Sequence, residues 1–215
     1  MAPDPDTLLA KNPIIAILRG IRPDEILNVA QILVDQGIKV IEVPLNSPDP
    51  YDSIKLLCDN FGSTCLCGAG TVVTAEQVDK VQQMGGQLIV SPNVDTAVIK
   101  RTIELGMVSV PGFSTPSEAY QAYHSGTTLL KMFPAANIGL DYFKSISTIM
   151  PKDAKVIATG GINPENICSW LSAGAIGLGI GGDLYKPGIS LDELRKKAES
   201  FNTAIVLNKK AGEPT

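Results

Sequence analysis

The stretch KVIATGGINPENICSWLSAGAIGLGI, residues 155–180, contains one complete strand–helix–strand unit. Its apolar runs Lys155–Ala158 and Ile176–Ile180 predict two strands. Between them, Asn163 is typical of a residue that precedes a helix, and we expect that helix over Pro164–Ala173. Two buried strands joined by a helix are typical of a parallel pair.

The same unit repeats along the chain. Short apolar runs without polar alternation predict parallel strands buried on both faces, at Ile14–Leu18, Ile38–Val43, Thr64–Gly68, Gln87–Val90, Met107–Val110, Thr128–Lys131, Lys155–Ala158 and Ile176–Ile180. Amphipathic stretches between them predict helices, at Asp24–Gln36, Pro50–Asn60, Ala75–Met84, Asp95–Leu105, Pro116–Ser125, Leu140–Met150, Pro164–Ala173 and Leu191–Leu207. Eight such units predict an α/β fold of the closed (β/α)8 TIM-barrel type.

The length bounds the domain organisation. With 215 residues, the chain is shorter than the roughly 250 typical of this barrel, so we expect one compact domain over 1–215. A short extension over 1–12 would precede it, and the tail 209–215 is expected to be mobile. The structural alternative is an open doubly wound sheet, but Arg19-Gly20-Ile21-Arg22 does not supply its Gly-x-Gly-x-x-Gly turn.

Composition narrows the partners. A net charge of −4 without any basic block argues against a nucleic-acid partner and favours a small-molecule ligand. No apolar run is long enough to span a membrane, and Met1–Lys11 lacks the pattern of a secretory signal. The spacing of the four cysteines is not that of a disulfide scaffold, so we expect reduced thiols in a cytoplasmic protein.

The cysteines and the single histidine also argue against two kinds of site. Cys65 and Cys67 have no partner ligands in the sequence, so we expect no metal. A Ser-His-Asp hydrolase would depend on His124 alone, which lies in a polar, helix-like stretch and is best explained as a surface residue.

Charged residues end three of the predicted strands at the end where a barrel enzyme has its active site. Arg19, Glu42 and Lys131 each follow an apolar run. Side-chain alternation places Arg19 on the same face as Ile15 and Ile17, Glu42 on the same face as Ile38 and Val40, and Lys131 on the same face as Leu129. A lysine can form an imine with a ketone, a carboxylate can move protons, and an arginine can hold a carboxylate. The alternatives are a lysine that extends into solvent and a salt bridge from Glu42 to Lys131 or Arg19 that closes the barrel end.

Paired glycines follow the last two predicted strands. Gly160-Gly161 and Gly181-Gly182 leave backbone N–H groups uncovered in front of helix-like segments, an arrangement that suits a phosphate group. Tight turns without a ligand are the alternative for each pair.

The residues together resemble a known family. The motifs that carry the resemblance occur in order between about Pro13 and Gly188, and they are Ala16-Ile17-Leu18-Arg19-Gly20-Ile21, Glu42-Val43-Pro44-Leu45-Asn46-Ser47-Pro48, Gly68-Ala69-Gly70-Thr71-Val72, Ser91-Pro92-Asn93, Leu130-Lys131-Met132-Phe133-Pro134 and Thr159-Gly160-Gly161. They are similar to the bacterial 2-keto-3-deoxy-6-phosphogluconate and -galactonate aldolases, which are class I enzymes without a metal or cofactor and are commonly trimeric.

The resemblance implies a role for each matching residue. It implies that Lys131 is the Schiff-base lysine and that Glu42 is the general acid/base. Arg19 and Thr71 would bind the pyruvate end of a phosphorylated sugar acid. Further substrate contacts are expected from the other motif residues, Asn46, Pro92, Phe133 and Thr159. The phosphate would lie near the glycine pairs, at Gly160, Gly161, Gly181, Gly182 and Asp183.

The sequence points two ways on the sugar acid. Pro44-Leu45-Asn46-Ser47 resembles the galactonate branch, whereas Thr159 resembles the gluconate branch. A hydroxyl at Thr159 can hydrogen-bond a substrate hydroxyl and so affect discrimination at C4. We expect the galactonate substrate, with the gluconate epimer, or both, as the alternative. More distant alternatives are an epimerase or isomerase with Glu42 as its base, and a phosphosugar-binding barrel without catalysis.

Overall fold

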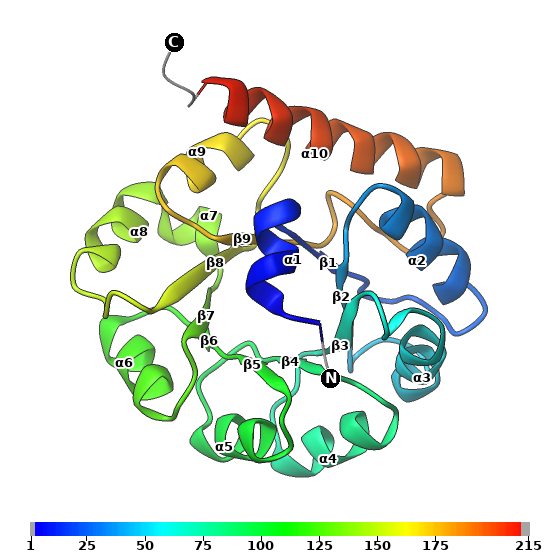
Figure 1. The fold of residues 1–215 in the computed structure, drawn as a ribbon, viewed down its shortest axis with the longest axis horizontal. Helices are drawn as coiled ribbons and strands as arrows, with labels where there is room; N and C mark the ends of the chain where they lie inside the picture. The colour runs from blue at the N-terminus through cyan, green and yellow to red at the C-terminus, as the bar shows by residue number, and fades with distance from the viewer. Residues whose placement is uncertain (1–2, 212–215) are drawn as a thin grey trace.

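The computed structural model describes residues 3–211, which form a parallel barrel surrounded by helices (Figure 1). Its strands are β1 Ile14–Ile17, β2 Val40–Pro44, β3 Leu66–Gly70, β4 Leu88–Val90, β5 Val108–Val110, β6 Gly112–Phe113, β7 Leu129–Met132, β8 Lys155–Thr159 and β9 Gly177–Ile180. Its helices are α1 Pro5–Lys11, α2 Ile26–Asp35, α3 Pro50–Phe61, α4 Ala75–Gln83, α5 Thr96–Glu104, α6 Pro116–His124, α7 Ala135–Ile138, α8 Leu140–Ser147, α9 Ile167–Ser172 and α10 Leu191–Ala211.

The barrel closes through a strand that is interrupted at Pro111. The strand order is β5-β4-β3-β2-β1-β9-β8-β7-β6, and every pair is parallel. Because β5 and β6 are separated only by Pro111, they are two halves of one barrel strand, whose first half pairs with β4 and whose second half pairs with β7. The carbonyl of Pro111 still accepts the N–H of Lys131 at 2.8 Å. The predicted (β/α)8 barrel is therefore confirmed, because the nine strand segments form eight barrel strands.

The predicted helices all form, and their starts follow local hydrogen bonding. Thr74 caps α4 and Thr115 caps α6, each in a reciprocal capping box with the residue three positions later. Two helices begin later than we predicted: α2, expected from Asp24, begins at Ile26, and α9, expected from Pro164, begins at Ile167. The Asn163 side chain accepts the N–H groups of Glu165 and Asn166, both at 3.0 Å, and this turn delays the helix.

Helix α1 lies within the part of the chain that we predicted only as an extension, so its helical structure was missed. Asp4 caps it by accepting the N–H of Thr7 at 2.9 Å, and Asp6 pairs with Lys155 at the start of β8. The helix lies across the centre of the barrel (Figure 1), where Leu9 packs against side chains of the barrel interior. It therefore closes the end of the barrel at which the strands begin. At the other terminus, residues 209–211 continue α10, and the rest of the predicted tail, 212–215, lies outside the described residues.

Two apolar clusters divide the side chains of the strands. The inner cluster fills the barrel and consists of Leu9, Ile15, Val40, Leu66, Leu88, Val90, Val110, Leu129 and Ile157. Neighbours in sequence, such as Ala16 and Ile41, belong to the outer cluster between strands and helices. This alternation places Glu42 and Lys131 above Val40 and Leu129 on the inner face. Ile38, which we expected on the same face as Glu42, instead belongs to the outer cluster. The reason is that β2 begins two residues later than we predicted, so strand alternation does not extend to Ile38.

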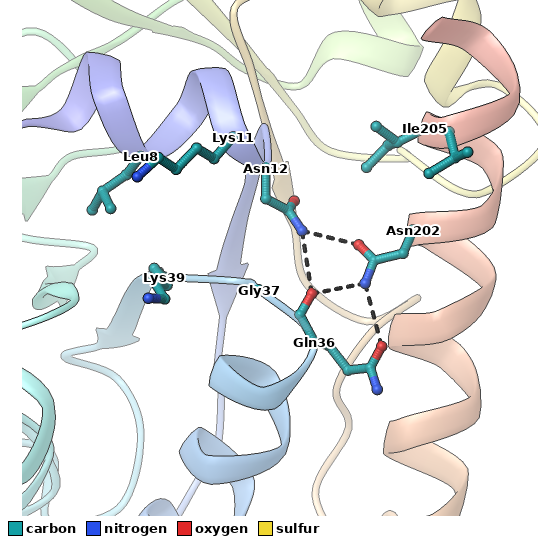
Figure 2. Close-up of a pocket in the computed structure, with 9 residues that line it drawn as sticks. Leu8, Lys11, Asn12, Gln36, Gly37, Lys39, Asn202 and Ile205 are labelled. Carbon is teal, nitrogen blue, oxygen red and sulfur yellow. Dashed lines mark hydrogen bonds between the residues drawn. The ribbon is translucent and has the colours of Figure 1, made fainter. Parts of the chain in front are cut away.

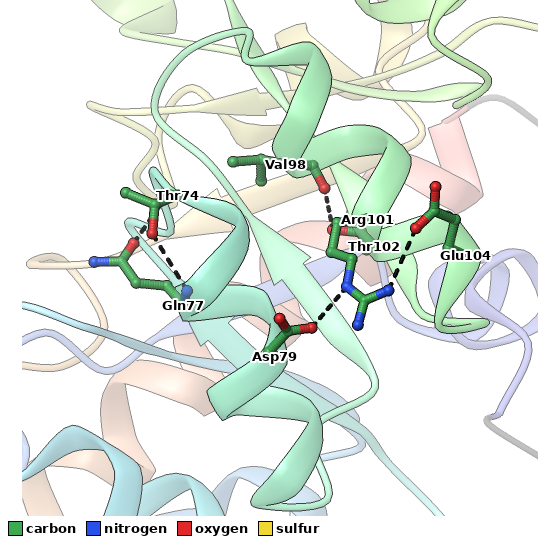
Figure 3. A network of polar contacts seen from close by, with 7 residues as sticks. All are labelled: Thr74, Gln77, Asp79, Val98, Arg101, Thr102 and Glu104. Atoms are coloured by element: carbon green, nitrogen blue, oxygen red, sulfur yellow. Dashed lines mark hydrogen bonds and ion pairs between the residues drawn. The ribbon is translucent and has the colours of Figure 1, made fainter.

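Polar contacts join neighbouring helices on the outside of the barrel. Figure 3 shows Arg101 of α5 between Asp79 of α4 and Glu104. Arg101 donates to Asp79 at 2.7 Å and to Glu104 at 3.4 Å. The Thr102 hydroxyl donates to the Val98 carbonyl within the same helix. Within residues 3–211, no helix is long and apolar enough to cross a membrane.

Candidate active site

Lys131 and Glu42 are buried at the mouth of the barrel, where the strands end. Lys131 lies near the end of β7 and is 7% exposed, whereas Glu42 lies in β2 and is 2% exposed. Burial of both partners of an acid–amine pair inside a barrel is uncommon, because charged groups lose their hydration there. The lysine therefore does not extend into solvent, as one alternative reading of the sequence required.

These two groups are close enough to interact electrostatically but do not form an ion pair. Among the described residues, no lysine or arginine nitrogen lies within 4.0 Å of a Glu42 carboxylate oxygen. Glu42 Oε2 is buried without a hydrogen-bond partner. The Lys131 ammonium lies 5.0 Å from the centre of the Phe133 ring. A salt bridge that merely closes the barrel end is therefore not what the structure contains, and both groups keep free capacity for a ligand.

Burial changes the proton affinity of both groups in the direction that favours their neutral forms. Loss of hydration raises the pKa of Glu42 to about 7, and the positive charges of Lys131 and Arg19 oppose this only partly. Burial lowers the pKa of Lys131; Glu42 opposes the shift, and Arg19 adds to it. A lysine with a lowered pKa supplies more neutral amine, and a carboxyl group that titrates near neutrality can both take and return a proton.

Glycines make the room that these side chains occupy. A Cβ added at Gly70 of β3 would come 1.8 Å from Oε2 of Glu42, so the carboxylate lies directly over this glycine. A Cβ at Gly179 of β9 would come 2.3 Å from Oγ1 of Thr159 in the same way. Thr159 is 3% exposed, and its hydroxyl has no hydrogen-bond partner within the described part of the chain. The hydroxyl is therefore available to a ligand.

Arg19 is held at the rim by two neutral groups. One arm of its guanidinium donates to Oδ1 of Asn46, and the other lies 3.5 Å from Oγ1 of Thr71. Thr71 follows β3 with a left-handed backbone, φ 58°. The sequence did not predict that these three residues contact one another, because they come from three different strand ends.

A cavity of about 350 Å³ connects Arg19 with the glycine pairs. Its lining includes most of the residues expected around a substrate, together with three that the sequence did not single out as site residues, Ile17, Ile162 and Gly179. The expected members are Arg19, Phe133, Thr159, Gly160, Gly161, Gly181, Gly182 and Asp183. Gly160 and Gly161 have φ values of 98° and 72°, a backbone conformation that residues with a side chain rarely adopt. Exposed backbone at this rim suits an anionic group.

Pro92 stands apart from the other predicted residues. It follows β4, and its backbone packs against Gly112, where a Cβ would come 2.5 Å from the Pro92 carbonyl. Of the residues that sequence reasoning missed, Ile17 and Gly70 had a signal: both occur in the quoted motifs and share the inward parity of the charged residues. The sequence carries no signal for the close approach of Gly70 to Glu42 or of Gly179 to Thr159, because these distances depend on the curvature of the barrel.

The described residues contain no group of three side chains suited to hold a metal ion. Cys65, just before β3, and Cys67 within it are free thiols buried in the outer cluster between strands and helices, so they do not face the barrel interior. The chemistry that the mouth itself offers is that of an amine, a carboxyl group and a guanidinium, which together suit a keto acid.

A second cavity lies at the opposite end of the barrel. Figure 2 shows it between α1, α2 and α10. Its volume is about 420 Å³. The amides there bond to one another: Asn12 donates to Asn202 at 2.9 Å, and Asn202 donates to the Gln36 carbonyl at 2.8 Å. No carboxylate is among the described residues that line it, so this larger cavity lacks the acid–amine pair that the mouth contains.

Comparisons with known proteins agree with this geometry. The family model for KDPG and KHG aldolases matches residues 6–197. The 2-dehydro-3-deoxy-6-phosphogalactonate aldolase of Escherichia coli (strain K12) is 44% identical over 191 residues, which cover 89% of this chain and 93% of that protein. A probable 2-dehydro-3-deoxy-6-phosphogalactonate aldolase of Rhizobium meliloti (strain 1021) is 42% identical over 188 residues, covering 87% and 89%.

The solved structures give the same picture. A structure described as native KDPGal is 42% identical to this chain and superimposes on it with a TM-score of 0.91. The superposition covers 93% of this chain and 97% of the other. The similarity therefore extends over the whole barrel rather than over a shared fragment.

Proposed function

The chain belongs to the KDPG and KHG aldolase family, and from this premise we propose that it is a class I aldolase that cleaves 2-dehydro-3-deoxy-6-phosphogalactonate to pyruvate and D-glyceraldehyde 3-phosphate. The proposal rests on one observation. Lys131 and Glu42 are both buried at the barrel mouth, where the charge of Glu42 affects the pKa of Lys131 although the two groups form no ion pair. An amine kept partly neutral and a carboxyl group that titrates near neutrality are the two groups that an imine-forming aldolase requires.

The reaction begins at Lys131. Its neutral Nζ attacks the C2 ketone, the hydroxyl of the carbinolamine takes a proton from solvent and leaves as water, and a protonated imine forms. Glu42 then takes the proton of the C4 hydroxyl as the C3–C4 bond breaks, and the electron pair of that bond moves to the imine and gives an enamine. Glyceraldehyde 3-phosphate leaves as the aldehyde. Glu42 returns the proton to C3, and water hydrolyses the remaining imine to release pyruvate and free Lys131.

The rim residues bind the two ends of the substrate. Arg19, with Thr71 beside it, holds the carboxylate next to the ketone. Gly160, Gly161, Gly181 and Gly182 offer backbone N–H groups to the phosphate at the other end of the same cavity, with Asp183 at its edge. The Phe133 ring lies beside the Lys131 side chain. Pro92, which follows β4, remains an expected substrate contact.

The choice of sugar acid depends on Thr159. The galactonate substrate is favoured by Pro44-Leu45-Asn46-Ser47 and by the names of the two relatives described above. The free hydroxyl of Thr159 faces the cavity and gives the gluconate epimer a hydrogen-bonding partner as well. Cleavage of that epimer is the alternative activity of the same site.

The chain would act as one domain over 1–215 and as a homotrimer in the cytoplasm. The family model supports one domain, since it matches a single uninterrupted stretch. The trimer rests on the family resemblance, and light scattering of the purified protein tests it. Free cysteines at Cys58, Cys65, Cys67 and Cys168 are compatible with a reducing compartment.

Trapping the imine tests the proposal. The protein is incubated with pyruvate and borohydride, and peptide mass spectrometry locates the reduced adduct. We expect the adduct on Lys131, and we expect Lys131→Met to lose both the adduct and cleavage. Lys144→Met is the matched control, because Lys144 lies exposed on α8, and it should retain both. Cleavage by Lys131→Met, or an epimerase or binding activity without any adduct, would overturn the proposal.

A further inference from the structure

Two turns at the barrel rim are bonded together beside the cavity. The turn after β1 carries Arg19 and Gly20, and the turn after β2 carries Asn46 and Ser47. Arg19 donates to Oδ1 of Asn46, and the N–H of Gly20 donates to Oγ of Ser47 at 2.9 Å. Ser47 is 9% exposed, so its bond is sheltered, whereas Asn46 lies at the exposed rim. The second turn therefore fixes both the backbone and the guanidinium of the first.

The partners of Arg19 are all uncharged. Besides Asn46, only the Thr71 hydroxyl lies within hydrogen-bond distance, and in the described chain no carboxylate oxygen lies within 4.0 Å of its nitrogens. Most other arginines of the chain lie beside carboxylates: Arg22 pairs with Asp24 and Arg101 with Asp79. An amide acceptor holds a guanidinium in place but leaves its charge uncompensated. That charge then remains available to an anion that enters the cavity.

An exposed arginine without such support would sample many rotamers. Ordering a long side chain costs rotamer freedom, and a bond made before the ligand arrives removes part of that cost from binding. The Asn46 bond also turns one edge of the planar guanidinium toward the β2 turn, and Arg19 itself lines the cavity.

We propose that Asn46 is a positioning residue that acts through Arg19: its side-chain oxygen orients the guanidinium for the carboxylate of the keto acid while leaving the positive charge free. This inference rests on the proposed function and refines the role of Asn46, which we expected to contact the substrate directly. Ser47 supports the same arrangement from the backbone side by holding Gly20.

The test uses imine trapping with two ketones, pyruvate and the neutral ketone acetone. Asn46→Ala is expected to raise the pyruvate concentration for half-maximal trapping about tenfold, as expected for loss of one hydrogen bond to a charged group. Trapping with acetone is expected to stay unchanged, because acetone has no carboxylate for Arg19 to hold. Asn60→Ala, an asparagine at the end of α3 far from the mouth, is the matched control and should behave as the parent protein.

A double-mutant cycle separates positioning from direct contact. In an Arg19→Ala background, adding Asn46→Ala is expected to have no further effect on pyruvate, because the residue through which Asn46 acts is gone. Asn46→Asp keeps the acceptor but compensates the charge, so we expect weaker pyruvate trapping and unchanged acetone trapping. Additive effects of Arg19→Ala and Asn46→Ala, or equal losses with both ketones, would overturn the inference. Absence of trapping in the parent protein would instead overturn the proposed function, so the two failures are distinguishable.

Discussion

Gly70 of β3 lies directly beneath the carboxylate of Glu42, where a Cβ would come 1.8 Å from Oε2 and 2.5 Å from Oε1. The neighbouring strands place these residues close together, because Glu42 pairs with Gly68 and Pro44 with Gly70. The buried carboxyl group therefore depends on the absence of a side chain on the next strand.

Gly70→Ala is expected to displace the Glu42 carboxylate and to reduce the rate of carbon–carbon cleavage by roughly 10²–10⁴-fold, the usual contribution of a positioned acid–base group. Lys131 would still be trapped by borohydride with pyruvate. The measurement is kcat for cleavage beside the trapping yield, with the urea midpoint as a control for folding. Unchanged cleavage in a folded Gly70→Ala protein would contradict this role of Gly70.

The raised pKa of Glu42 predicts a pH-dependent stability. Its carboxyl group keeps its proton in the folded protein up to about pH 7, whereas the ordinary value is 4.5. Between these pH values the folded state binds more protons than the unfolded state, so the free energy of unfolding falls as pH rises. This shift corresponds to about 3 kcal/mol, fully lost above pH 7.

Urea unfolding at pH 5 and pH 8 measures this effect. Glu42→Gln removes the titrating group, so we expect its stability to change less between these pH values than that of the parent protein. Glu118→Gln offers a comparison, because backbone N–H groups lower the pKa of that carboxyl group, and the stability it contributes is lost only at acid pH. Equal pH dependence of Glu42→Gln and the parent protein would show that Glu42 is not the source.

Thr159→Val is expected to shift the choice between the two C4 epimers. The substitution removes the unpartnered hydroxyl and keeps the branched shape, so the ratio of kcat/KM for the galactonate over the gluconate substrate should rise, by up to about tenfold. Rates of pyruvate formation from each epimer provide the measurement. Thr203→Val on the exposed face of α10 is the control. An unchanged ratio would mean that the Thr159 hydroxyl does not contact the substrate.

Leu9→Ala is expected to lower the free energy of unfolding by about 2–4 kcal/mol. Leu9 is 4% exposed and fills the barrel interior at the end where the strands begin. Imine trapping at Lys131 should remain, since the mouth lies at the other end. Leu207→Ala, with Leu207 63% exposed, should change stability by less than about 0.5 kcal/mol. A similar small effect of Leu9→Ala would mean that α1 does not stabilise the barrel.

The strand ends were predictable from the sequence because a buried parallel barrel leaves a simple pattern. A charge that ends an apolar strand, such as Lys131 after Leu129–Leu130, is expected at the mouth, and alternation then assigns Lys131 and Glu42 to the inner face. Helix α1 was missed because it is short and its two large apolar residues, Leu8 and Leu9, form no helical period. The bond between Arg19 and Asn46 was also unpredictable, because it joins separate turns whose distance is set by barrel closure.

The glycines at the mouth limit how this cavity can change. Gly70 and Gly179 already present bare main chain to Glu42 and Thr159, so nothing can be trimmed from them. A substitution at either glycine can only reduce the volume of the cavity, because the backbone already sets its upper limit. Variants that accept a bulkier sugar acid are therefore to be sought at side chains such as Ile17 and Phe133, which still have atoms to lose.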